Sequence, residues 1–176
     1  MLRWRRLMAR AGAALCAFAL FAAAPASAVE EADLKAAIVY NLLLFVDWPA
    51  DAVPAPGANL VLCLRPASAY AAALRALAAR PLRGMQLELR EIPAAAEIDK
   101  SCHVLLVEAA EPARLAALAR LPKSASVLVI ADTTDAAVDL VDAVAISLQG
   151  SDRKITFDVN LGAARRARLQ LSSKPR

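Results

Sequence analysis

Cys63 and Cys102 are the residues of this sequence best able to form a covalent link with each other. In an oxidising compartment one disulfide is the simplest pairing, and it would stabilise the fold by about 4 kcal/mol in the chain-entropy model. Cys63 falls late in one predicted strand and Cys102 just before another, which separates them by roughly 15 Å if the strands are in-register neighbours. The bond therefore requires staggered strands, or a segment before His103 that folds back along the sheet; otherwise both thiols stay free.

His103 is the only histidine of the chain, which limits the catalytic and metal-binding chemistry available. A Ser-His-Asp or Cys-His arrangement would have to use it as the base, and no G-x-S-x-G nucleophile elbow accompanies it. Cys102 and His103 are adjacent, and adjacent residues on a strand point to opposite faces, so the pair is poorly placed to hold one metal ion. We therefore expect no catalytic residues and no metal site.

Asp132, Thr133, Thr134 and Asp135 follow a predicted buried strand, where ligand-binding carboxylates lie in α/β folds. A small-molecule site and a hydrolase that uses Asp132 are two functional interpretations of this segment. Capping of the next helix by Asp132 or Thr133 is the structural interpretation, and we favour it. The sequence contains no glycine-rich phosphate-binding motif, so we expect no nucleotide cofactor.

The first 28 residues have the pattern of an export signal. Their basic residues are Arg3, Arg5, Arg6 and Arg10. An uncharged stretch over residues 11–24 follows, and Ala26-Ser27-Ala28 then has the small-x-small pattern of a signal-peptidase site. A membrane-spanning helix is the alternative, but the uncharged run is shorter than the roughly 20 residues that a bilayer core requires. We expect a signal peptide over residues 1–28, cleaved after Ala28, and a periplasmic mature domain over residues 29–176 that does not span the membrane.

Removal of this segment changes the charge of the chain. The full sequence has 21 basic and 17 acidic residues and a net charge of +4. Four of the basic residues and none of the acidic ones lie in the first 28, so the mature chain has 17 of each. A neutral chain lacks the clustered cations that release counterions from nucleic-acid phosphates. We therefore expect no nucleic-acid partner.

The first predicted element of the mature chain is an amphipathic helix over residues 31–46. Its predicted apolar face consists of Leu34, Ala37, Ile38, Asn41, Leu42 and Phe45. The helix ends at Asp47-Trp48-Pro49, because the residue before a proline is disfavoured in the α region and proline lacks a backbone donor.

Alternating strand and helix patterns then predict an α/β fold in a single domain, with a mainly parallel sheet flanked by helices. The predicted strands cover residues 59–64, 85–92, 103–107 and 126–131, and the predicted helices cover residues 68–80, with Ser68 as cap, and 111–120. Residues 85–92 alternate strictly between apolar and polar side chains, which is typical of an edge strand. The other three strands are apolar after their first residue, as central parallel strands are.

The last third of the chain predicts a C-terminal β-hairpin and a helix. Residues 143–149 and 153–159 are alternating runs joined by Gly150-Ser151-Asp152. Asn160 begins a helix that extends to about Arg168. Its arginines suit the negative end of the helix dipole, or an acidic partner surface.

Two stretches of the sequence together resemble the opening and closing signatures of the YfiR family of exported bacterial regulators. They are the residues from Asp33 to Pro49, and Ile155-Thr156-Phe157-Asp158-Val159-Asn160-Leu161 followed by Ala163-Ala164-Arg165 and Leu171-Ser172-Ser173. The motif residues, which we expect to be mainly structural, are Tyr40, Asn41, Phe45, Trp48, Pro49 and Asn160. Cys63 and Cys102 also lie where this family often has cysteines.

The resemblance implies a non-enzymatic periplasmic protein, often a homodimer, that binds the periplasmic part of an inner-membrane diguanylate cyclase. Such a protein holds the cyclase inactive and lowers cyclic-di-GMP signalling and biofilm formation. Family members also accompany other membrane sensors, so a sensor kinase is a second candidate partner. The best-known member has another disulfide near its final hairpin, where this sequence has no cysteine. A periplasmic small-molecule receptor is the alternative function.

Overall fold

The fold was analysed in a computed structural model of the chain. It describes residues 26–55, 57–93, 96, 98, 101–108, 111, 113–114, 118, 125–134, 142–151 and 154–174. Residues 1–30 and residues 31–176 form two separate units, and the second contains the sheet and its core. The predicted signal peptide lies almost entirely outside the described residues, so the signal and its cleavage site stay predictions.

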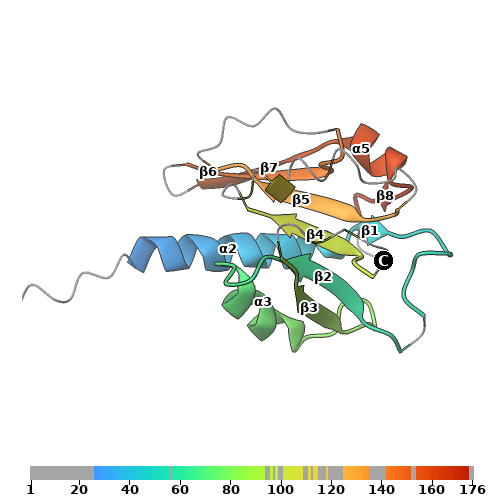
Figure 1. The fold of residues 1–176 in the computed structure, drawn as a ribbon, viewed down its shortest axis with the longest axis horizontal. Coiled ribbons are helices and arrows are strands. Elements are labelled where there is room, and N and C mark those ends of the chain that lie inside the picture. Colours follow the sequence, from blue (N-terminus) through green and yellow to red (C-terminus); the bar gives the residue numbers. More distant parts are fainter. Residues whose placement is uncertain are drawn as a thin grey trace, which may run out of the picture. The chain divides into compact units, whose positions relative to one another are not determined.

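A six-stranded sheet forms the centre of the second unit (Figure 1). Its strands are β2 (Leu60–Leu64), β3 (Leu87–Glu91), β4 (Val104–Val107), β5 (Leu128–Asp132), β6 (Ile146–Ser151) and β7 (Lys154–Val159). They lie in the order β3-β2-β4-β5-β6-β7, and every neighbouring pair is parallel except β6 and β7, which are antiparallel. The predicted α/β fold with a mainly parallel sheet and a C-terminal hairpin is therefore confirmed, as is the edge position of β3.

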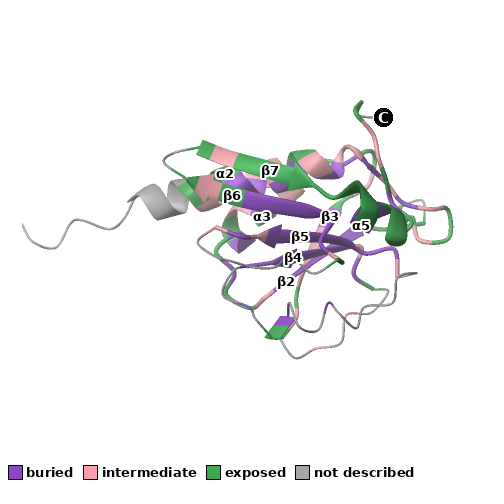
Figure 2. Cartoon of the chain, turned by 90° about the horizontal axis from the view of Figure 1, so that it is seen from above, coloured by how far each residue is buried: buried purple, intermediate pink, exposed green. Residues whose placement is uncertain are grey.

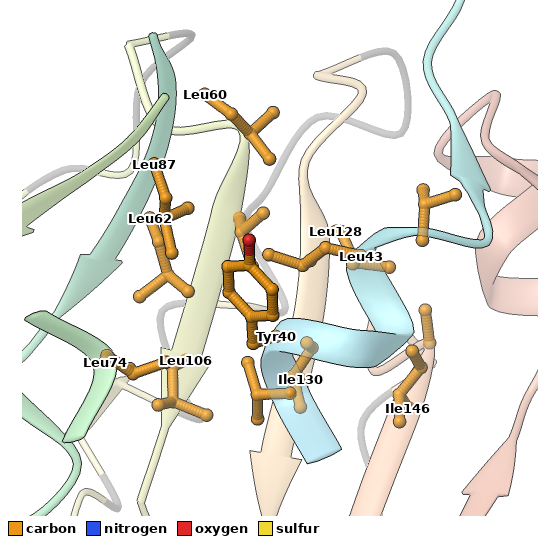
Figure 3. Packing of buried hydrophobic residues seen from close by; sticks show 14 of the residues in the cluster. Tyr40, Leu43, Leu60, Leu62, Leu74, Leu87, Leu106, Leu128, Ile130 and Ile146 are labelled. Atoms are coloured by element: carbon orange, nitrogen blue, oxygen red, sulfur yellow. The ribbon is translucent and has the colours of Figure 1, made fainter. Parts of the chain in front are cut away.

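Helices cover one face of this sheet over a large apolar core. α2 (Ala26–Leu43), α3 (Ala71–Ala78) and α5 (Leu161–Arg166) all contribute buried residues to this core. Figure 3 shows Tyr40 and Leu43 of α2 above the leucines and isoleucines of the central strands. A smaller core on the opposite face contains Leu118, which is helical, together with Cys63 and Cys102. The rest of the predicted helix over residues 111–120 lies largely outside the described residues.

Helix α2 buries a different face from the predicted one. Its buried residues are Lys35, Ala36, Val39, Tyr40 and Leu43. Leu34 and Asn41 are exposed, and the other residues of the predicted apolar face are only partly buried. The prediction was wrong because this segment is apolar around most of its circumference, so two stripes of helical spacing compete.

The ends of three elements also differ from the predictions. α2 ends at Leu43 because Val46–Asp47 form strand β1. α3 begins at Ala71 and has no side-chain cap, since the Ser68 hydroxyl instead accepts a hydrogen bond from the Tyr70 N–H in the preceding turn. β6 extends through Gly150 and Ser151, which the sequence assigned to the hairpin turn.

A second, two-stranded sheet joins the beginning and the end of the domain. β1 pairs antiparallel with β8 (Gln170–Leu171), so that Val46 lies opposite Leu171. The Ser172 N–H also donates to the Phe45 carbonyl at 2.8 Å. The two stretches that resemble family signatures are therefore in direct contact, although the sequence did not predict this pairing.

Candidate functional site

A cluster of polar side chains lies at the carboxyl end of β5, where the sequence placed its candidate carboxylate. Asp132 accepts hydrogen bonds from Lys35 Nζ at 3.2 and 3.0 Å, and from the Tyr70 hydroxyl. Lys35 Nζ also lies 2.7 Å from Glu31 Oε1 and 2.7 Å from Thr134 Oγ1. We call these five residues the Asp132 cluster. It joins α2 and the segment before α3 to the end of the sheet.

The pKa shifts within the Asp132 cluster favour a fixed ion pair. Burial opposes the charged form of Asp132, but hydrogen bonds from Tyr70, Thr134 and Lys35 outweigh it and hold the pKa of Asp132 below its ordinary value. Burial likewise opposes the charge of Lys35, and its contacts with Glu31 and Asp132 raise its pKa. Burial, followed by the hydrogen bond to Asp132, raises the pKa of Tyr70. Lys35 and Asp132 therefore stay charged and Tyr70 stays neutral at physiological pH.

The described residues test the capping interpretation only in part. Asp132 does accept the Thr134 N–H at 3.0 Å, in a turn contact of the expected kind. Its principal partners, however, are Lys35 and Tyr70, which the sequence analysis did not single out. Thr133 donates its hydroxyl to the Leu148 carbonyl at 3.0 Å. Asp135 and the helix that these residues were expected to cap lie outside the described residues. A lone lysine within an apolar helix was the one available signal for this cluster.

A second group of charges lies where the sheet changes direction. The chain passes from β2 to β3 on one side and then to β4 on the other, which creates the point where doubly wound sheets bind ligands. Arg65 after β2 and Glu108 after β4 form an ion pair there, with Nε and Oε1 3.1 Å apart. Glu111 accepts the Glu108 N–H and pairs with Arg114, which is fully buried. Side chains of the protein itself therefore occupy this position.

His103 has a structural role in the backbone. The ring Nδ1 of His103 accepts a hydrogen bond from the Val61 backbone N–H at 3.0 Å, and the backbone N–H of His103 donates to the Val61 carbonyl at 3.0 Å. Burial, and then the nearby Arg90, lower the pKa of His103, so the neutral acceptor form predominates. Among the residues that the structure describes, no three His, Cys, Asp or Glu side chains lie close enough to share a metal ion.

The structure contains the disulfide between Cys63 and Cys102, with their Cα atoms 5.8 Å apart. Cys63 lies opposite Leu105 in the β2–β4 register, three residues beyond Cys102. The strands are staggered, since Leu62 rather than Leu60 lies opposite Val104, and this shortens the separation expected for in-register strands. The distance of 5.8 Å further requires the chain before β4 to leave the line of the strand, so the staggered and the fold-back alternatives both contribute. Both cysteines are buried in the smaller core.

The motif residues of the resemblance do not gather at one site. Tyr40 is buried and donates its hydroxyl to the Arg80 carbonyl at 3.1 Å. Trp48 is buried, Phe45 and Pro49 are half-buried, and Asn41 is exposed. Asn160 caps α5 by accepting the Ala163 N–H at 2.9 Å. Four of the six therefore face the interior at least in part, and Asn160 fixes the start of a helix.

A pocket of about 470 Å³ opens at the base of the C-terminal hairpin. It is lined by Val144, Ala145, Ser147, Asp158, Val159, Asn160 and Leu161. Most of these side chains are apolar, and Leu161 at its rim is 51% exposed. We call it the hairpin-base pocket; the sequence analysis did not predict it.

An α/β domain whose charges at the sheet's carboxyl edge pair with one another, and which exposes an apolar pocket, has the features of a binding module. The model of the YfiR/HmsC-like family matches residues 32–174, and the chain belongs to this family. The suspected resemblance is thereby confirmed. This family is periplasmic, and its members are regulators rather than enzymes.

No curated relative matches the chain. Within the described residues, no helix has both the length and the apolarity needed to cross a bilayer.

Proposed function

We propose that this protein is an exported regulator that inhibits an inner-membrane diguanylate cyclase, or a related sensor kinase, by binding its periplasmic part. The hairpin-base pocket is the observation that carries the proposal. It exposes apolar side chains beside Asp158, whereas the charged groups of the Asp132 cluster pair with one another, and exposed apolar surface flanked by polar residues is typical of protein-binding sites.

The chemistry of the pocket defines what the partner presents. Val144, Val159 and Leu161 suit an apolar side chain, and Asp158 suits a hydrogen-bond donor beside it. Binding that favours the inactive conformation of the cyclase shifts its conformational equilibrium toward that state, and the ratio of the affinities for the two conformations limits the shift. Lower cyclic-di-GMP and less biofilm are the expected consequences.

The small-molecule receptor is less well supported. A receptor site near Asp132 requires free polar groups around a cavity, whereas the carboxylate of Asp132 is engaged by Lys35, Tyr70 and the Thr134 N–H. The same contacts argue against a hydrolase that uses Asp132, because its hydrogen-bonding positions are taken by the protein.

Titration of the purified protein with the periplasmic domain of a candidate cyclase or sensor kinase, sought first in the adjacent reading frame, tests the proposal. We expect Leu161→Asp to weaken this binding at least tenfold, because it places a charge at the rim of the pocket. Leu34→Asp is the matched control, since Leu34 of α2 is 50% exposed and Leu161 is 51% exposed. Equal affinities of the two variants would place the partner elsewhere.

Deletion of the gene tests the regulatory direction. Intracellular cyclic-di-GMP and surface attachment should both rise, and complementation with the unmodified gene should restore them while Leu161→Asp should not. Unchanged cyclic-di-GMP in the deletion strain, with the partner cyclase expressed, would refute inhibition.

A further inference from the structure

The hairpin of β6 and β7 is attached to the rest of the sheet over a short distance. Among the described strands only β5 pairs with the hairpin, and its ladder with β6 has three pairs, the last of them Asp132 opposite Leu148. The ladder between β6 and β7 has six pairs and no break, and β7 itself is mostly exposed (Figure 2). The hairpin is therefore held more firmly within itself than against the sheet, so a contact at its tip also affects the position of its base.

Thr134 extends this attachment beyond the last pair of the β5–β6 ladder. The Gly150 backbone N–H, at the tip of the hairpin, donates to Thr134 Oγ1 at 2.8 Å. Lys35 Nζ of α2 donates to the same oxygen at 2.7 Å. A hydroxyl has two lone pairs and one proton, so these two donors use its lone pairs and leave its proton for Asp132, with which the Thr134 side chain also forms a hydrogen bond. Thr134 thus joins the hairpin tip to the Lys35–Asp132 ion pair.

The hairpin tip also packs directly against α2. A Cβ atom at Gly150 would overlap Glu31 Oε1 and would lie 3.3 Å from Lys35 Cε. Glu31 Oε1 is held in this place by Lys35 Nζ, which lies 2.7 Å from it. Gly150 is therefore a position where the strand can approach the helix closely only because it carries no side chain.

We propose that Thr134 is a positioning residue for the hairpin-base pocket, because its hydroxyl fixes the hairpin to α2 in the arrangement that the partner binds. The inference rests on the proposed function, in which this pocket receives the partner. Thr134 is not among the residues that line the pocket, so its effect on binding passes through the hairpin. Without the hydroxyl, Lys35 and Asp132 still contact each other directly at 3.0 Å. The specific contribution of Thr134 is the link to the tip.

Three variants isolate this link. Thr134→Val removes the hydroxyl at little change of shape and leaves the Gly150 N–H without its acceptor, which favours a displaced tip. Thr134→Ser keeps a hydroxyl and should act like the unmodified protein. Thr133→Val is the matched control, because it makes the same change at the neighbouring residue while the Thr133 backbone N–H still donates to the Leu148 carbonyl at 2.8 Å.

Amide hydrogen exchange of the purified protein, measured by NMR, tests the positioning without a partner. We expect Thr134→Val to accelerate exchange about tenfold, beyond any change in global stability, at the Gly150 amide and at the Asn160 amide. The Asn160 N–H donates to the Ala145 carbonyl at 2.8 Å at the base of the hairpin. Thr133→Val and Thr134→Ser should change both rates less than about twofold. Acceleration at Gly150 alone would show that the tip opens without moving the base, which would overturn the proposal.

Titration with the candidate periplasmic domain tests the consequence for binding. We expect Thr134→Val to weaken binding about fivefold and the other two variants to weaken it less than about twofold. Equal affinities of Thr134→Val and Thr133→Val would overturn the proposal, whatever the exchange rates. If the unmodified protein binds no candidate domain, the proposed function fails, and the exchange rates at the hairpin base still decide whether Thr134 positions it.

Discussion

Individual charged residues of this protein are placed to neutralise one another across distant parts of the chain. Lys35 and Asp132 are separated by 97 residues, yet their charged atoms lie 3.0 Å apart. Glu108 is matched in the same way by Arg65. A buried charge is tolerated when it is paired and hydrogen-bonded, and these pairs account for polar residues at the end of an otherwise apolar sheet.

His103 gives a prediction at this scale. The pKa of His103 in the folded protein is below its value in the unfolded chain, so as the pH falls the unfolded chain takes up a proton before the folded protein does. We expect the free energy of unfolding to be fully retained above pH 6.5 and to decrease as the pH falls below it. His103→Asn is the control, because an amide oxygen can accept the Val61 N–H without titrating. Urea denaturation between pH 5 and 8 measures the difference; identical pH profiles would show that His103 does not contribute.

At the scale of the element, Lys35 fixes α2 on the sheet. The side chain of Lys35 is 5% exposed and that of Asp132 is 13% exposed, so both charges are largely buried. Lys35→Met therefore leaves a largely buried carboxylate without its cation. We expect a loss of about 3 kcal/mol in the free energy of unfolding, as for other broken buried pairs. Glu31→Gln, which removes the more exposed partner of Lys35, should cost less than about 1 kcal/mol. Denaturant titration compares them, and similar losses would contradict a buried Lys35–Asp132 anchor.

Local patterns predicted the strands well because each strand carries its own signal. β2, β4 and β5 are apolar runs, and β3 alternates, so their positions in the sheet follow from the sequence. The buried face of α2 could not be predicted in this way, because Leu34 and Ala36 begin equally apolar stripes and only the sheet decides between them. β1 and β8 are two residues long, too short to have a pattern.

The candidate site was less predictable than the fold. Asp132 was found because a carboxylate after a buried strand is a local feature, but its partners Lys35 and Tyr70 come from distant elements. The hairpin-base pocket depends on how α5 begins beside β6 and β7, which no single segment encodes. The stagger and the fold-back that together join Cys63 to Cys102 were two of three alternatives that strand geometry left open.

For the whole molecule, the disulfide gives the clearest stability prediction. It links residues 39 positions apart, and a loop of that length corresponds to about 4 kcal/mol in the chain-entropy model. Replacement of both Cys63 and Cys102 by alanine should lower the free energy of unfolding by about this amount. Treatment with a reductant should destabilise the unmodified protein and leave the double variant unchanged; a reductant effect on both would point to another cause.

The contact between β1 and β8 has a consequence for the timing of folding. Val46 finds its partner only when Leu171 is present, so the two-stranded sheet forms after almost the whole polypeptide has been delivered. A chain that passes N-terminus first through a translocation channel cannot pair β1 with β8 while its last residues are still inside the channel. If the chain is exported as proposed, the two-stranded sheet therefore closes only after translocation is complete.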